Sequence, residues 1–555
     1  MMDKSNKDTT LKIAKLAIVV FVLVYIGIKI IPPPDETLES IIKDIKVSTV
    51  THPKGTFEIQ PTPLIDILPE IRKYPPQVNE STPNYIEIFS SPEKAGRGTD
   101  GWLTEVARDF NNAKIMIDGR PVSVRLRGIA SGQGADYITS GKYLPDAYTP
   151  SNELWGEMIA SQGVRILLVQ KKLVGNVAGT LLTKAKKDEL DAKYGAIDIS
   201  TIAEAVTNNE LAMGYTDPLS SSTGLNFLIS ALHTFDSSDL LSEKAKAGLK
   251  SFQANIPVIA HTTLQLRDAA TSGVLDGFIL EYQTYMNTPS IRSYEFVPFG
   301  FRHDSPMYAI GELSPAKMEI LNQFVQFSQQ EKYQVLATKY GFGGLNEYQS
   351  KDKTVRGDVI IRAQKILKDM KNAGKPICAV FVVDVSGSME GEPLIKLKRS
   401  LLEGQKYIGK DNQVGLISYS NNVHIDLPIA EFDINQRSKF AGAIDDLQAG
   451  GSTATFDAIA IAMDLLTKQK AVGVEADPNL KPRIFVLSDG KQNEGHSLEE
   501  IEKIVKDLGM PINTIGYNAN IPELQKISNI NEGVCINADN EDVAYKLSNL
   551  FNAEM

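Results

Sequence analysis

The chain has 555 residues, a formal net charge of −10 and 42% hydrophobic residues, so it can form several folded domains. The acidic balance argues against a nucleic-acid partner, because a surface that binds nucleic acid needs a basic patch to neutralise phosphates. Two distant cysteines exclude a disulfide scaffold, and six scattered histidines offer no zinc-binding spacing.

The N-terminus predicts a membrane anchor over residues 1–31. Lysines precede an apolar run from Leu16 to Ile28, which is short for a membrane span and also fits the core of a signal peptide. An uncleaved anchor is favoured, because residues 32–35 (PPPD) offer no small-residue cleavage site. The lysines predict a cytoplasmic N-terminus, a single pass through the cell membrane and an extracytoplasmic location for the rest of the chain.

Residues 32–83 contain many prolines and no long apolar periodicity. Proline breaks helices and favours extended backbone, so this segment predicts a stalk that separates the folded part from the bilayer. A linker without function is the alternative interpretation.

Residues 84–345 predict an α/β region with a parallel sheet. A strand is expected at 85–89, an amphipathic helix at 102–110, a further strand at 122–130 and a helical run at 315–340. Polar residues that follow the expected strands are the candidates for ligand binding: Ser90, Ser131, Asp217, Ser221, Ser222, Thr223 and Tyr282. Hydroxyl and backbone N–H groups at a helix start suit a polar ligand, although the same residues also serve as ordinary helix caps.

The order of these segments resembles the two-lobed extracytoplasmic solute-binding proteins of bacterial uptake systems. The resemblance implies one lobe from 84–172 and 278–345, a second lobe from 173–277, and a small solute in the cleft between them. Asp217 and Glu281 would oppose a bound anion, so the class of solute stays open.

Residues 346–375 then predict a polar connector with a helical apolar stripe, which we expect to pack against a neighbouring domain.

The strongest signal begins at 377–383 (ICAVFVV), an apolar run typical of a central parallel strand. Asp384, Ser386 and Ser388 follow it, and Gly387 permits the sharp turn that would bring their oxygens together. Strands are expected at 413–419, 483–490 and 512–517, and they alternate with helices. This alternation predicts a doubly wound parallel sheet over residues 376–555.

Residues 376–555 resemble the von Willebrand factor A family and its metal-ion-dependent adhesion site. The D-x-S-x-S motif of that family matches Asp384, Ser386 and Ser388, its loop threonine matches Thr453, and its later aspartate matches Asp489. Ser452 could take the place of Thr453 if the loop aligns one residue differently. The resemblance implies a hard cation, Mg²⁺ or else Mn²⁺ or Ca²⁺, with an open position for a carboxylate of a partner. A polar turn without metal is the alternative interpretation.

These features predict a membrane-anchored binding protein that recognises a protein or surface partner through the metal ion. The two-lobed region would be a second recognition module. The alternative is a receptor component of a transport system, with the metal-binding domain as scaffold or regulator. No nucleophile with an adjacent base stands out in the sequence, so we do not expect an enzyme.

Overall fold

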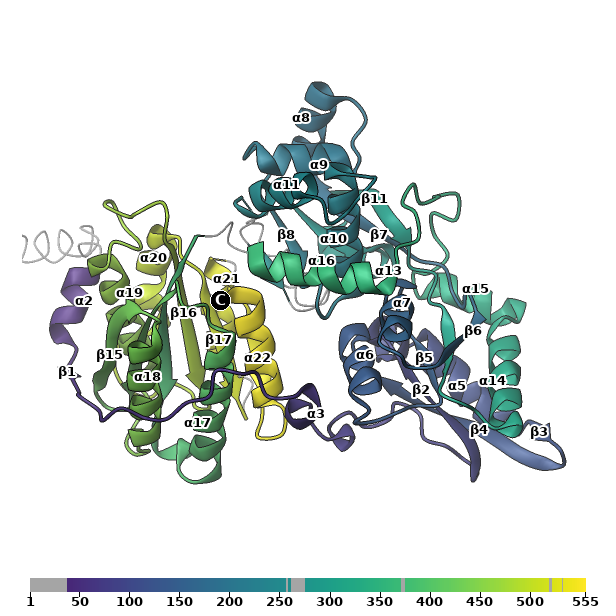
Figure 1. Ribbon diagram of the computed structural model, residues 1–555, viewed down its shortest axis with the longest axis horizontal. Coiled ribbons are helices and arrows are strands. Elements are labelled where there is room, and N and C mark those ends of the chain that lie inside the picture. The colour runs from purple at the N-terminus through teal and green to yellow at the C-terminus, as the bar shows by residue number, and fades with distance from the viewer. Residues whose placement is uncertain (1–36, 256–257, 261–274, 371–374, 519–521, 532) are drawn as a thin grey trace, which may run out of the picture.

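A computed structural model describes residues 37–255, 258–260, 275–370, 375–518, 522–531 and 533–555. Three β-sheets, each with its own helices, form the two lobes of the central region and the C-terminal domain (Figure 1). The predicted anchor at 1–31 lies outside these ranges. Within them, no helix is both long enough and apolar enough to cross a membrane.

The first lobe has a six-stranded sheet in the order β3-β4-β2-β5-β12-β6. Its strands are β2 (Asn84–Ser90), β3 (Met116–Ile117), β4 (Arg120–Gly128), β5 (Ala147–Thr149), β6 (Ile166–Gln170) and β12 (Met307–Ile310). Its helices are α4 (Pro92–Ala95), α5 (Trp102–Asn112), α6 (Ser131–Ser140), α7 (Leu154–Ser161), α14 (Pro315–Ser328) and α15 (Glu331–Lys339). Strand β2 pairs in parallel with β4 and β5, as the βαβ pattern predicts. The sheet is mixed and not wholly parallel as predicted, because β12 runs antiparallel to β5 and β6.

The second lobe has a five-stranded sheet in the order β11-β7-β10-β8-β9. Its strands are β7 (Val177–Thr183), β8 (Met213–Thr216), β9 (Val258–Ala260), β10 (Gly277–Glu281) and β11 (Tyr294–Arg302). Its helices are α8 (Lys184–Tyr194), α9 (Ile199–Thr207), α10 (Ser222–Phe235), α11 (Glu243–Gln253) and α13 (Tyr282–Met286). The predicted return to the first lobe at residue 278 was wrong, because β10 and β11 pair with β7 in the second sheet. The chain returns between β11 and β12.

The C-terminal domain has a seven-stranded sheet in the order β1-β15-β14-β13-β16-β17-β18. Its strands are β1 (Val47–Thr49), β13 (Ile377–Asp384), β14 (Gln413–Tyr419), β15 (Val423–Glu431), β16 (Lys481–Ser488), β17 (Ile512–Tyr517) and β18 (Cys535–Ala538). Its main helices are α2 (Leu38–Asp44), α17 (Glu392–Gly404), α18 (Ile434–Asp446), α19 (Thr455–Lys468), α20 (Leu498–Leu508), α21 (Pro522–Ile530) and α22 (Val543–Glu554). The sheet is mixed and not wholly parallel as predicted, because β15 runs antiparallel to β14.

Strand β13 separates two hydrophobic cores because its side chains alternate between the faces of the sheet. Ala379, Phe381 and Val383 face the core under α17, α18 and α22, whereas Val380 and Val382 face the core under α2, α19, α20 and α21. All eight residues of the strand are buried. This burial fixes the position of the loop that follows Asp384.

The segment predicted as a stalk packs on the folded units instead, with its first part on the C-terminal domain and its last part on the first lobe. Helix α2 buries Ile41 and Ile45 in the same core as α19, and β1 pairs in parallel with the start of β15. His52 then bridges two carboxylates, with its Nδ1 3.0 Å from Asp446 Oδ2 and its Nε2 3.0 Å from Asp426 Oδ1. We call residues 37–56 the N-terminal arm. A few apolar side chains of the arm are buried against the C-terminal domain, which is distant in the sequence. The local periodicity of the arm does not reveal such a contact.

The first lobe and the C-terminal domain contact each other through α6 and α22. Tyr545 of α22 donates a hydrogen bond of 2.8 Å to Asp136 Oδ2 of α6. Beside it, Lys73 pairs with Asp539 and lies 3.6 Å from Asp542, and both aspartates lie in the turn between β18 and α22. Burial raises the pKa of Asp136 to about 7, against the hydrogen bond from Tyr545 and with a further increase from Asp217.

We expect this contact to weaken as the pH rises. The pKa of Asp136 in the folded protein lies above its ordinary value of 3.8, so its stabilising contribution is complete below about pH 4 and is lost as the pH rises through about 7. In the wild-type protein, the free energy of unfolding should decrease by on the order of 1–2 kcal/mol between pH 5 and pH 8. Asp136→Asn should not show this decrease. Melting curves of both proteins across this range test the prediction, with the exposed Asp507→Asn as control. Equal pH slopes for wild type and Asp136→Asn would contradict it.

Candidate metal site and solute cleft

The five predicted metal ligands lie on three loops at one edge of the C-terminal sheet. Asp384 ends β13, Asp489 follows β16, and Thr453 precedes α19. Because the carboxyl ends of adjacent parallel strands meet at the same edge, β13 and β16 bring the two aspartates together. The loop from 386 to 389 is held against the Thr453 loop by a hydrogen bond of 3.0 Å from Gly387 N–H to Gly451 C=O.

Hydrogen bonds connect the oxygens of these residues. Ser388 Oγ donates to Asp489 Oδ1 at 2.7 Å and lies 3.1 Å from Ser386 Oγ. A methyl group placed on Gly490 would lie 3.4 Å from Thr453 Oγ1 and 3.6 Å from Ser388 Oγ, so both hydroxyls face the same small space. The sequence left Ser452 as an alternative to Thr453. In the structure the Thr453 hydroxyl faces this space, whereas the backbone N–H of Ser452 donates to Asn421 Oδ1.

The sharp turn after Asp384, for which the sequence singled out Gly387, does not place that glycine in the left-handed region. Residues Gly387–Met389 form a single 3₁₀ turn, and the positive φ in this loop, 84°, belongs to Gly391. The serine oxygens are brought together by the turn itself, with Ser386 N–H donating to Asp384 Oδ1 at 2.8 Å. This hydrogen bond and one from Ser488 Oγ to Asp384 Oδ2, at 2.6 Å, fix the carboxylate in place.

The charge of the site suits a cation. Burial raises the pKa of Asp384, although hydrogen bonds from Ser386, Ser488 and Tyr419 oppose the increase. Burial and the nearby charge of Asp384 also raise the pKa of Asp489, against the hydrogen bond from Ser388. Two carboxylates and three hydroxyls are a hard, all-oxygen donor set, which fits a divalent ion such as Mg²⁺. Clusters of three or more His, Cys, Asp or Glu residues are absent from the described ranges, so hydroxyls are needed to complete this site.

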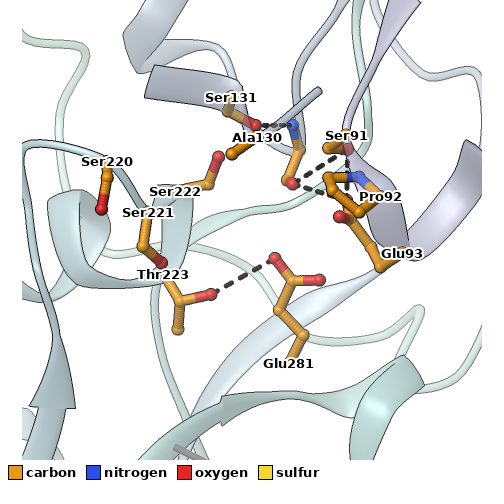
Figure 2. Close-up of a pocket in the computed structure, with 11 residues that line it drawn as sticks. Ser91, Pro92, Glu93, Ala130, Ser131, Ser220, Ser221, Ser222, Thr223 and Glu281 are labelled. Atoms are coloured by element: carbon orange, nitrogen blue, oxygen red, sulfur yellow. Dashed lines mark hydrogen bonds between the residues drawn. The ribbon is translucent and has the colours of Figure 1, made fainter. Parts of the chain in front are cut away.

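A second candidate site is a cavity of about 60 Å³ between the two lobes (Figure 2). Such a volume holds several water molecules or one compact solute. The lobes are closed around it, since Gly132 N–H donates to Ser220 C=O at 3.0 Å and Asn152 Nδ2 donates to Ser222 C=O at 3.0 Å. The residues that line it are Ser91, Pro92, Glu93, Ala130, Ser131, Ser151, Ser220, Ser221, Ser222, Thr223 and Glu281.

The structure places four of the seven predicted cleft residues in this lining: Ser131, Ser221, Ser222 and Thr223. Ser90 is buried behind Ser91, and the Asp217 carboxylate accepts from Leu219 N–H at 3.0 Å within its own turn. Tyr282 packs against Phe296 with ring centroids 5.3 Å apart. These three residues therefore lie outside the cavity lining.

Sequence reasoning missed Glu93 and Ser151. Glu93 belongs to a single helical turn, and Ser151 follows the three-residue strand β5, so neither has a periodic signal. Ser151 Oγ donates to Glu93 Oε1 at 2.6 Å. Burial acts to raise the pKa of Glu93, but the charge of Lys94 and the hydroxyls of Ser151 and Ser91 outweigh it, so the pKa is lowered. The buried Lys94 thus compensates the charge of Glu93.

Glu281 is compensated in the same way from the second lobe. Its Oε1 lies 2.8 Å from His303 Nδ1 and accepts from Thr223 Oγ1 at 3.2 Å. Its Oε2 accepts from Asn176 Nδ2 at 3.1 Å. The carboxylate that was expected to oppose an anion therefore already has protein partners on both oxygens.

Three serine hydroxyls of the lining keep a hydrogen for a ligand. Ser222 Oγ accepts from Trp155 Nε1 at 2.9 Å, and Ser131 Oγ accepts from Ser151 N–H at 3.4 Å. Ser221 Oγ accepts from Thr216 Oγ1 at 2.8 Å and from Gly224 N–H at 3.4 Å. A hydroxyl that accepts from the protein still has its own O–H to donate. The cavity therefore presents donors to a ligand that carries acceptors.

Comparison with known proteins agrees with this division of the chain. Residues 379–553 match the family model of the von Willebrand factor type A domain, and residues 95–343 match that of the bacterial extracellular solute-binding protein. Inter-alpha-trypsin inhibitor heavy chain H2 of Sus scrofa is 30% identical over 190 residues, which are 31% of this chain and 19% of the relative. The chain thus spans about a fifth of the length of that relative.

Solved structures show similarity to each part separately. A von Willebrand factor type A protein from Catenulispora acidiphila is 16% identical, with a TM-score of 0.29, over 32% of this chain and 42% of its own. Iron-bound HitA from Pseudomonas aeruginosa is 14% identical, with a TM-score of 0.36, over 53% of this chain and 100% of its own. By the family-model matches, the chain has a region similar to the bacterial extracellular solute-binding proteins, which is followed by a region similar to the von Willebrand factor type A domain.

Proposed function

We propose that this chain is a membrane-anchored, extracytoplasmic binding protein that recognises a protein or surface partner through a divalent metal ion. The observation that supports the proposal is the convergence of Asp384, Ser388 and Asp489 at the carboxyl edge of β13 and β16. Mg²⁺ fits this all-oxygen set best, with Mn²⁺ and Ca²⁺ as alternatives. A carboxylate of the partner would complete the coordination of the ion. We assign the chain no catalytic activity.

Calorimetric titration of Mg²⁺ into the full chain, after removal of metal with a chelator, tests this function. We expect saturable binding with one strong site per chain. The same titration with Mn²⁺ and Ca²⁺ ranks the cations. A chain that is folded but takes up none of the three ions would end the metal-based proposal.

We further propose that the cleft binds a compact oxyanion. The free hydroxyl hydrogens of Ser131, Ser221 and Ser222 support this class of solute, because an oxyanion offers only acceptors. Lys94 offsets the charge of Glu93, and the Glu281 oxygens are already directed to His303, Thr223 and Asn176 rather than left free to face the ligand. This cleft also favours the second candidate function, in which the chain is the receptor component of a transport system.

Sulfate, phosphate and molybdate are the probes for the cleft. We expect one of them to bind the full chain, and Ser222→Ala to weaken that binding about tenfold, because it removes a hydrogen bond to a charged ligand. Ser200→Ala, an exposed serine of the same lobe, is the control and should bind as wild type does. Equal affinity of Ser222→Ala and Ser200→Ala would contradict a role for the hydroxyl. Binding of an uncharged solute in place of all three anions would refute the oxyanion class.

A further inference from the structure

Helix α16 (Gly357–Met370) contacts all three folded units of the chain. It packs against α7 of the first lobe and against α10 and α11 of the second lobe, and it lies between the lobes in Figure 1. Ile360, Ala363 and Leu367 are buried in a hydrophobic core that both lobes share. The helix therefore has one continuous apolar side that covers the boundary between the lobes.

The contact with the first lobe is made at the start of the helix. A Cβ atom on Gly357 would lie 1.9 Å from the carbonyl oxygen of Glu157 in α7. Any side chain at this position would thus collide with backbone. The absence of a side chain allows the first turn of α16 to touch α7 directly.

The contact with the second lobe is made about two turns later. Gln364 is buried, and its Nε2 donates a hydrogen bond of 2.8 Å to the carbonyl oxygen of Pro218. Pro218 lies in the turn before α10, two residues from Ser220, whose carbonyl accepts from the first lobe across the closed cleft. Gln364 therefore holds the turn that closes over the ligand cavity.

The contact with the von Willebrand factor A domain is made near the end of the helix. Lys368 Nζ lies 5.1 Å from the centroid of the Tyr407 ring, which follows α17 in that domain. An ammonium group over an aromatic ring is attracted to its face. One helix of 14 residues thus contacts the first lobe, the cleft turn of the second lobe and the metal-binding domain in sequence.

We propose that α16 is a latch that holds the two lobes closed and couples opening of the cleft to the seating of the von Willebrand factor A domain. An α-helix is stiff and, at this length, extends about 21 Å. If the lobes separate, Glu157 and Pro218 move apart, and α16 must release one of them. The end of the helix that carries Lys368 then moves relative to Tyr407. The latch operates whichever solute binds, so it does not depend on the proposed oxyanion.

Hydrogen–deuterium exchange of the full chain tests the latch without any ligand. Gly357→Val breaks the contact with α7, and Gln364→Leu removes the hydrogen bond to Pro218. In both variants we expect amides of residues 131–136 and 219–224 to exchange about tenfold faster than in wild type. Lys365→Gln, on the exposed side of the same helix, is the matched control and should leave these amides unchanged. Faster exchange confined to α16 itself would overturn the proposal.

Coupling is reciprocal, which gives a second test. Lys368→Met keeps most of the side-chain volume but removes the charge over Tyr407. We expect it to accelerate exchange at residues 219–224 several-fold, because the latch is loosened from the other end. Unchanged exchange there, in a protein whose circular dichroism matches wild type, would show that the helix joins the domains without coupling them.

Discussion

If Mg²⁺ binds the proposed site, we expect it to stabilise the von Willebrand factor A domain, and Asp384→Asn is expected to abolish that stabilisation. A ligand present at about 100 times its dissociation constant stabilises the folded state by about 2.7 kcal/mol. Asp384 is fully buried and held by Ser386 and Ser488, so its carboxylate is already positioned to bind the ion. The asparagine keeps the shape but loses the charge that balances a divalent cation.

The two cysteines provide a probe for this measurement, because Cys378 is buried in β13 and the half-buried Cys535 begins β18. Burial raises the pKa of Cys378 to about 12, so its thiol reacts only when the domain opens. Thiol labelling during a thermal ramp, with and without Mg²⁺, should show a shift for wild type and none for Asp384→Asn. Asp411→Asn, an exposed aspartate of the same domain, should shift as wild type does. An equal shift in Asp384→Asn would place the ion elsewhere.

Ile41→Ala is expected to destabilise the von Willebrand factor A domain by about 2–5 kcal/mol, although this residue lies more than 300 positions before the domain in the sequence. Ile41 is 2% exposed in the core that it shares with α19, α20 and α21. Truncation there leaves a cavity between α2 and α19, and the loss of α2 would also weaken the short pairing of β1 with β15.

Two probes distinguish this effect from a general loss of stability. Both tryptophans, Trp102 and Trp155, lie in the first lobe, so their fluorescence reports that lobe, whereas thiol labelling reports the C-terminal domain. Denaturant titration of Ile41→Ala should lower the thiol midpoint and leave the fluorescence midpoint nearly unchanged. Ile59→Ala, an isoleucine that is 61% exposed shortly after the arm, should change neither midpoint. A thiol midpoint equal to that of wild type would show that the arm contributes nothing to the domain.

The sequence was sufficient for the parts whose signal is local. The apolar run before Asp384, and the strands at 413–419 and 512–517, appear in the structure with those bounds or within one residue of them. Their residues are buried on both faces of the sheet, which produces continuous apolar runs. The positions of the predicted metal ligands could be inferred because they lie at the carboxyl edge of the sheet: Asp384 ends β13, Asp489 follows β16, and Thr453 precedes α19.

The remaining features depend on contacts that are distant in sequence. The sequence did not predict β15, because this strand has Pro428 in its interior and exposed residues at its end. Both features are typical of strands at the edge of a sheet, and β1 covers only the first three residues of β15. Glu93 and Ser151 approach the cavity only when two short elements of the first lobe meet. The β11-to-β12 crossing could not be placed because residues 277–302 are equally compatible with either sheet until their partners are known.

The N-terminal arm also limits where a partner of the metal site can be. Only five residues separate Ile31, the last residue of the proposed anchor, from Thr37, and this segment can span at most about 20 Å. A 52-residue stalk would instead have placed the first folded domain about 150 Å from the bilayer. If the chain is anchored as proposed, the point where the arm joins the von Willebrand factor A domain lies within about 20 Å of the lipid surface. On the proposed anchoring, the partner of the metal site is therefore within reach of the same membrane rather than on a distant surface.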